Sequence, residues 1–259
     1  MNDIPTSLVV ACYIIVFIYG AVIGSFVNVC ICRIPRKESI VKVRSHCENC
    51  GYVLKWYDLV PICSYLFLGG KCRKCGTKIS VQHLFMEVLN GALYVLVFHV
   101  CKISVESLLY CLTGSALLVL SVIDFKTYEI PVGCNYFIGA LGFIRIATDY
   151  QNWSLYLIGA VSVSLFLFLL YVLSRGRAIG GGDIKLMAAA GLLLGWKLIL
   201  LAFGIGCIVG SVTHLIRMKV SKEDHVLAMG PYLSVGIMMA ALWGNRFLQW
   251  YLGSMGLQL

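Results

Sequence analysis

The stretch Ala116-Leu-Leu-Val-Leu-Ser-Val-Ile-Asp124 ends an apolar run with a carboxylate. A second aspartate, Asp183, follows the glycine run Gly180-Gly-Gly and lies beside another apolar segment. A charged side chain at membrane depth is costly, so such residues usually serve a function. Two aspartates in this setting predict a carboxylate pair, which fits either an aspartic protease or an ion pathway.

The composition of the chain indicates a membrane protein. Its 259 residues are 60% hydrophobic and 13% charged, with a mean hydropathy of +0.88, whereas soluble domains are nearer ~45–50% apolar and ~25% charged. Apolar segments of membrane-spanning length predict an all-α polytopic protein with about eight transmembrane helices. The expected spans are residues 8–32, 84–101, 107–123, 130–147, 154–173, 184–196, 198–216 and 230–252.

The sixth expected span, residues 184–196, is short, and a re-entrant segment is the alternative. The basic residues favour a full crossing. With eight spans and the N-terminus outside, 17 of the 21 Lys and Arg residues fall in inner loops, as the positive-inside rule requires. Without the sixth crossing, Arg217, Lys219 and Lys222 would lie outside.

This topology places Asp124 and Asp183 at the cytoplasmic ends of their helices, where they can meet. It also explains the net charge of +9, because inner loops face anionic lipid of the bilayer. A nucleic-acid partner is therefore not expected.

Residues 33–82 form a long polar insert after the first span. Within it, Cys47, Cys50, Cys72 and Cys75 make two C-x-x-C-G motifs, which predict a four-cysteine zinc site. A metal would supply folding energy that so small and polar a segment lacks. A redox-active disulfide pair is the alternative, but the insert is expected to face the reducing cytoplasm. Four thiolates complete the zinc coordination shell, so the site would be structural.

The ordered set of motifs resembles that of the type IV prepilin peptidases, membrane aspartic proteases of the G-x-G-D type. The resemblance covers nearly the whole chain. Its matching stretches are Gly24-Ser-Phe-Val-Asn-Val-Cys-Ile-Cys-Arg-Ile-Pro35, the two C-x-x-C motifs, Asp124-Phe-Lys-Thr-Tyr-Glu-Ile-Pro131, Gly180-Gly-Gly-Asp-Ile-Lys185 and Gly230-Pro-Tyr-Leu233.

The resemblance implies an endopeptidase that removes the short basic leader of prepilins or pseudopilins at the cytoplasmic face of the inner membrane. It assigns Asp124 and Asp183 as the catalytic pair. Gly180, Gly181, Gly182 and Lys185 would lie near the substrate, because glycine lets another backbone approach closely. A hinge at the start of a helix is the alternative role of these glycines.

Many members of that family also methylate the new N-terminus with S-adenosylmethionine. The chain has no glycine-rich dinucleotide motif, so no residues are assigned to this cofactor. The resemblance divides the chain into a first transmembrane helix at residues 1–32, a zinc-binding insert at residues 33–82 and a protease core at residues 83–259.

Two other functions remain open at this point. A transporter or channel would account for Asp124 and Asp183, but it gives no reason for the cysteine-rich insert. An assembly scaffold that has lost its active site conflicts with the complete set of motifs.

Overall fold

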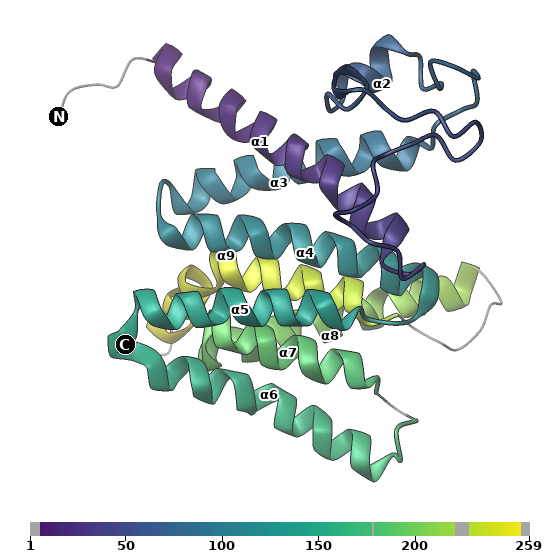
Figure 1. Cartoon of the computed structure of the whole chain (residues 1–259). Coiled ribbons are helices and arrows are strands. Elements are labelled where there is room, and N and C mark those ends of the chain that lie inside the picture. Colours follow the sequence, from purple (N-terminus) through teal and green to yellow (C-terminus); the bar gives the residue numbers. More distant parts are fainter. Residues whose placement is uncertain (1–5, 178, 221–227, 255–259) are drawn as a thin grey trace. The chain divides into compact units, whose positions relative to one another are not determined.

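The computed structural model describes residues 6–177, 179–220 and 228–254 (Figure 1). These residues are mainly helical, and their only β-structure is two isolated bridges. The long helices are α1 (Thr6–Arg33), α3 (Val81–Cys101), α4 (Val105–Thr127), α5 (Val132–Thr148), α6 (Trp153–Leu173), α7 (Gly181–Leu194), α8 (Trp196–Val220) and α9 (Gly230–Ser254). Three short helices are η1 (Trp56–Asp58), α2 (Cys63–Phe67) and η2 (Tyr150–Asn152).

Each predicted span coincides with a helix, and the all-α prediction is confirmed. Among the described residues, five helical segments are long and apolar enough to cross a membrane, namely α1, α3, α4, η2 with α6, and α8. The chain is therefore a multi-pass membrane protein. Helix α7 has 14 residues and reaches only about 21 Å, against about 30 Å of hydrocarbon. Its full crossing stays a prediction, and Lys222 of the charge argument lies outside the described residues.

The chain folds as two compact units, residues 1–107 and 108–259. In the first unit, α1 packs closely along α3. A Cβ on Gly24 would lie 2.8 Å from the Glu87 Cα, and one on Gly20 would lie 2.8 Å from the Gly91 Cα. Small residues permit this approach of two backbones in lipid. Helix α3 thus clusters with α1, although the functional boundary predicted at residues 82 and 83 groups it with the protease core.

In the second unit, α7 packs against α5 and α6 (Figure 1). Gly159 of α6 and Gly191 of α7 meet with no space for a Cβ on either residue. Helix α7 is largely buried, with Leu186, Met187 and Ala190 fully enclosed. Helices α8 and α9 pack on each other in the same unit. This packing fixes the N-terminal end of α7, where Asp183 lies.

Candidate active site and metal centre

Asp124 lies in the last turn of α4 and is only 4% exposed. Its Oδ2 accepts a hydrogen bond of 2.9 Å from the backbone amide of Gly230, the first residue of α9. A Cβ on Gly230 would lie 2.7 Å from this oxygen. Glycine is therefore needed for α9 to begin so close to the carboxylate.

Asp183 is the third residue of α7, in its first turn. Its backbone amide donates to the Gly180 carbonyl at 3.2 Å. The side-chain Oδ1 is buried and has no hydrogen-bond partner among the described residues. A buried carboxylate oxygen without a donor is costly, and such exceptions in a native fold often mark a functional site.

The second unit brings the two carboxylates near one another, close enough for Asp124 to act electrostatically on Asp183. Two neighbouring carboxylates in a poorly solvated place cannot easily both be charged. Neighbouring carboxyls of this kind take up protons as a pair. One protonated and one ionised carboxyl would supply an acid and a base.

The turn between α4 and α5 links the two aspartates. Asn135 of α5 donates from Nδ2 to the Gly182 carbonyl at 3.3 Å, and a Cβ on Gly182 would lie 2.7 Å from the Ile130 Cβ. Asn135 is 4% exposed, and its buried Oδ1 has no hydrogen-bond partner within the described part of the chain. The segment before Asp183 is thus held by the same turn that follows Asp124.

Three of the four residues predicted to lie near the substrate are more exposed than the two aspartates. Gly180, Gly181 and Lys185 are exposed, while Gly182 is half-buried against Ile130. Their contact with a substrate stays a prediction.

The four predicted metal ligands come together in the insert. The Sγ atoms of Cys47, Cys50, Cys72 and Cys75 all lie within 4.8 Å of one another. The Cys47–Cys75 pair is 3.8 Å apart and the Cys50–Cys72 pair 3.9 Å apart, and all four cysteines are free thiols. Four sulfurs at about 2.3 Å from one tetrahedral ion would be about 3.8 Å apart. The cluster therefore fits a zinc-sized ion.

The two C-x-x-C-G motifs form the same hairpin, displaced by 25 residues. Each hairpin has an isolated antiparallel bridge, between His46 and Val53 in the first and between Lys71 and Lys78 in the second. In the first hairpin, the Cys47 amide donates to the Tyr52 carbonyl and the Gly51 amide to the Cys47 carbonyl. The same two backbone hydrogen bonds recur in the second hairpin, from Cys72 to Thr77 and from Gly76 to Cys72. Gly51 and Gly76 have φ values of 67° and 71°, in the left-handed region that favours glycine.

The thiols of the cluster differ in how readily they ionise, because their surroundings shift their pKa values in opposite directions. The Thr77 hydroxyl and amide lower the pKa of Cys75 to about 5. At Cys50, a hydrogen bond from the Tyr52 backbone lowers the pKa. Burial and the neighbouring sulfurs outweigh it and raise the pKa of Cys50 to about 11. The thiolate is the form that binds metal. A cation among the sulfurs would let all four ionise.

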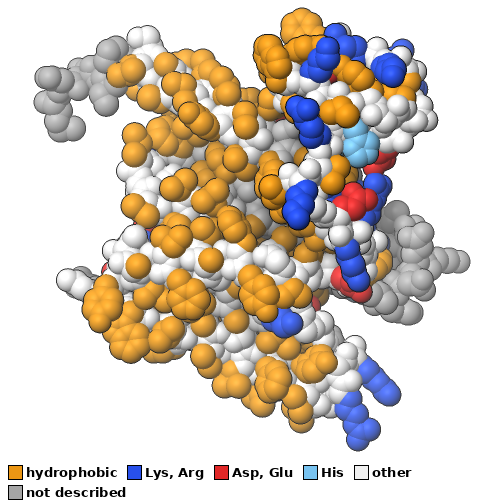
Figure 2. All heavy atoms as spheres, in the orientation of Figure 1, with side chains coloured by type: hydrophobic (Ala, Val, Ile, Leu, Met, Phe, Trp, Pro, Cys, Tyr) orange, Lys and Arg blue, Asp and Glu red, His pale blue; other side chains and the backbone are white. Residues whose placement is uncertain are grey.

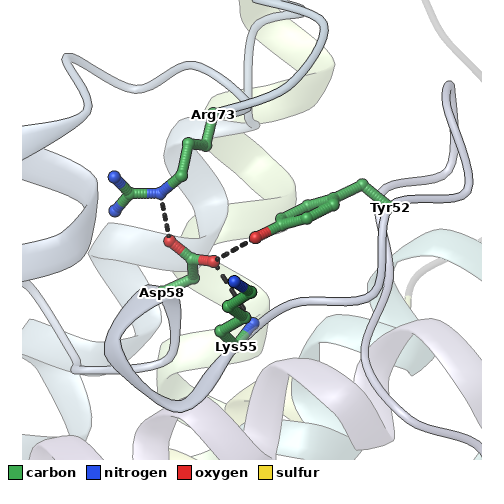
Figure 3. A network of polar contacts seen from close by, with 4 residues as sticks. All are labelled: Tyr52, Lys55, Asp58 and Arg73. Carbon is green, nitrogen blue, oxygen red and sulfur yellow. Dashed lines mark hydrogen bonds and ion pairs between the residues drawn. The ribbon is translucent and has the colours of Figure 1, made fainter.

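Asp58 joins the two hairpins (Figure 3). Its side chain is 1% exposed and accepts from Arg73 Nε at 2.8 Å, the Tyr52 hydroxyl at 3.3 Å and the Lys55 amide at 3.2 Å. Burial alone would raise the pKa of Asp58, but these hydrogen bonds hold it below its ordinary value. Because Tyr52 belongs to the first hairpin and Arg73 to the second, the ionised Asp58 holds both.

Comparison with known proteins identifies the family. The model of the bacterial peptidase A24 N-terminal domain matches residues 18–101, and that of the type IV leader peptidase family matches residues 111–215. A prepilin leader peptidase/N-methyltransferase of Bacillus subtilis is 31% identical over 242 residues, which cover 92% of this chain and 97% of the relative. The chain belongs to the type IV leader peptidase family.

Further relatives carry the same printed name. One from Vibrio cholerae is 31% identical over 88% of this chain and 95% of its own length. Another, from Legionella pneumophila, is 27% identical over 93% of this chain and 94% of its own length. No solved structure matches the chain. The family predicted from the sequence is confirmed, and each family model falls within one of the two compact units.

The sequence did not predict the contact of Asn135 with Gly182 or the hydrogen bond from Gly230 to Asp124. A signal for Asn135 was present, since it is an amide side chain in an otherwise apolar helix four residues after Pro131. Gly230 gave none beyond its place in a matched motif, because its contact with Asp124 joins residues 106 positions apart.

Proposed function

We propose that the chain is a membrane aspartic endopeptidase that cleaves the leader from type IV prepilins or pseudopilins and then methylates the new N-terminus. The observation that carries the proposal is the proximity of Asp124 and Asp183 in the unit matched by the leader peptidase model. The printed name of the relatives, prepilin leader peptidase/N-methyltransferase, supplies the substrate class and the second activity.

In the proposed reaction, one carboxylate removes a proton from water, and the water oxygen attacks the scissile carbonyl carbon. The second carboxyl, in its protonated form, donates to the carbonyl oxygen or to the leaving amine. If the amine has received the proton directly, the carbon–nitrogen bond breaks and the pair keeps the proton taken from water. If the carbonyl oxygen has received it, the first carboxyl passes the proton from water to the amine as the bond breaks, and the new hydroxyl returns its proton to the second carboxylate.

The hydrogen bonds favour Asp124 as the base. The Gly230 amide donates directly to Asp124, and a hydrogen bond to a charged group contributes about 1.5–3 kcal/mol. The charge of Asp183 is favoured by the Gly180 backbone and by the helix N-terminus, the latter worth about 0.3–1 kcal/mol. Its buried Oδ1, however, has no donor among the described residues. Asp183 is therefore assigned as the acid, with Asn135 positioning it through the Gly182 carbonyl.

The cysteine cluster is proposed to bind one structural Zn²⁺ through Cys47, Cys50, Cys72 and Cys75. The sulfur separations support this ion. When bound, it would stabilise the insert and take no part in cleavage, because four thiolates complete its coordination. S-adenosylmethionine is the proposed methyl donor, on the basis of the relatives' names, and no residues are assigned to it.

The proposed location is the bacterial inner membrane, with the carboxylates towards the cytoplasm. The excess of Lys and Arg in the predicted inner loops supports this orientation.

The decisive experiment is to incubate the purified protein in detergent with a prepilin and to measure the shortened product by mass spectrometry. We expect cleavage at the end of the leader. A transporter, a channel or an inactive scaffold would yield no product, and that result would overturn the proposal.

A further inference from the structure

Three of the exposed large apolar side chains of the insert lie on its two short helices, η1 and α2. Trp56 of η1 is 79% exposed, and Leu66 and Phe67 of α2 are 64% and 90% exposed. The two short helices contact each other. Lys55 precedes Trp56, and Lys71 follows α2 by four residues. We call these five residues the insert patch. Figure 2 shows hydrophobic side chains along the left edge of the insert, and separate Lys and Arg side chains among further hydrophobic ones elsewhere on it.

A hydrogen bond fixes the position of α2 along the membrane helix α3. The Ile62 amide, directly before α2, donates to Glu87 Oε2 at 2.8 Å. Glu87 is the seventh residue of α3 and is buried, so it lies about 9 Å along the helix from Val81. Helix α2 therefore begins beside the first two turns of α3, level with the start of the span predicted for residues 84–101.

The net charge of the insert favours an anionic binding partner. Residues 33–82 contain 10 Lys and Arg against three Asp and Glu, a net charge of 10 − 3 = +7. Four thiolates around a divalent ion would lower this value by two. A basic prepilin leader carries the same sign as the insert and would be repelled. Anionic lipid headgroups carry the opposite sign and attract basic segments beside a membrane helix.

We propose that the insert patch is an interfacial anchor that binds the anionic bilayer surface. Trp56, Leu66 and Phe67 enter the zone between headgroups and acyl chains, where aromatic side chains are enriched. Lys55 and Lys71 meet the lipid phosphates. The insert leaves α1 at Arg33 and returns to α3 at Val81, so both of its ends are already held at the membrane and its contact with lipid is intramolecular.

Tryptophan quenching in lipid nanodiscs tests the proposal on the full chain. The chain has five Trp residues, so the emission of Trp56 is obtained as the difference between the wild type and Trp56→Phe. In nanodiscs of phosphatidylcholine and phosphatidylglycerol with brominated acyl chains, we expect this emission to fall at least twofold relative to unbrominated discs. Equal Trp56 emission in both discs would overturn the proposal.

Hydrogen exchange gives a second measurement that does not depend on tryptophan. The double variant Leu66→Ser/Phe67→Ser should exchange the amides of residues 59–68 at least threefold faster in nanodiscs than the wild type. Val41→Ser is the matched control, because Val41 is 84% exposed in another loop of the insert, and it should leave that segment unchanged. An equal effect of both variants would contradict an anchor at the patch.

Lipid charge and substrate are separated by two further comparisons. Lys55→Gln/Lys71→Gln should reduce the quenching of Trp56 in anionic discs to its level in neutral discs. If Trp56 is instead unquenched by lipid and its emission shifts only when a prepilin is added, the patch binds substrate and the proposal fails. These readouts do not require cleavage, so they stand apart from a failure of the proposed peptidase activity.

Discussion

At Asp124 and Asp183, asparagine keeps the shape of the side chain and removes its ionisable group. General acid–base catalysis contributes about 10²–10⁴-fold, so we expect Asp124→Asn or Asp183→Asn alone to slow prepilin cleavage by at least about 100-fold. The measurement is the initial rate of product formation, with helix content and elution as a monodisperse species as folding controls. A near-normal rate in either variant would remove that residue from the pair.

Two neighbouring glycines distinguish packing from substrate approach. A Cβ on Gly182 would meet Ile130, whereas one on Gly181 would meet no atom of the described residues within 4 Å. Overpacking costs about 1–3 kcal/mol, so Gly182→Ala should displace the first turn of α7 and reduce cleavage at least tenfold. Gly181→Ala should keep the rate within about threefold. Strong loss in Gly181→Ala would show that a substrate backbone, and not Ile130, requires glycine there.

At the scale of the insert hairpins, we expect one zinc ion per chain. Replacing any of Cys47, Cys50, Cys72 or Cys75 by serine should lower the zinc content and speed hydrogen exchange across residues 45–79. The aspartate pair should be affected less, because four thiolates hold the ion away from the chemistry. Elemental analysis measures the metal. Zinc-free protein, or disulfides among these cysteines detected by mass spectrometry, would favour the redox alternative.

Asp58 and Glu48 provide a matched pair of acidic residues in the same insert. Asp58 is buried and bonded to both hairpins, whereas Glu48 forms an exposed ion pair with Arg36. Asp58→Ala should destabilise the insert by about 1–3 kcal/mol, the cost of losing a buried acceptor. Glu48→Ala should cost under about 1 kcal/mol. The rate of zinc loss to a chelator compares them, and equal rates would contradict the role of Asp58.

The sequence predicted the elements better than the contacts between them. Apolar length located every long helix, and the C-x-x-C-G spacing identified four sulfurs that converge, because both signals are local. The bonds of Asp58 to Arg73 and of Asn135 to Gly182 depend on chain segments that meet only after folding. The grouping of α3 with α1 likewise depends on the close contact at Gly24, which hydropathy does not report.

At the scale of the whole molecule, the two proposed activities should separate. Methyl transfer follows cleavage but does not need the carboxylate pair to activate water. An already shortened pilin should therefore accept methyl from S-adenosylmethionine on Asp183→Asn at a rate within about threefold of the wild type. Radiolabel incorporation measures the transfer. Wild-type protein that cleaves well yet leaves its product unmethylated would be a peptidase alone.

The short α7 helix has a consequence for how product leaves. Gly195 alone joins α7 to α8, beside Trp196 and Lys197, residue types that mark a membrane interface. Asp183 lies 11 residues before Leu194, about 17 Å along α7 from that end of the helix and at the opposite end, which is predicted to face the cytoplasm. A pilin cut at that level keeps its apolar segment in lipid. It would depart sideways within the bilayer, with no step of extraction into water.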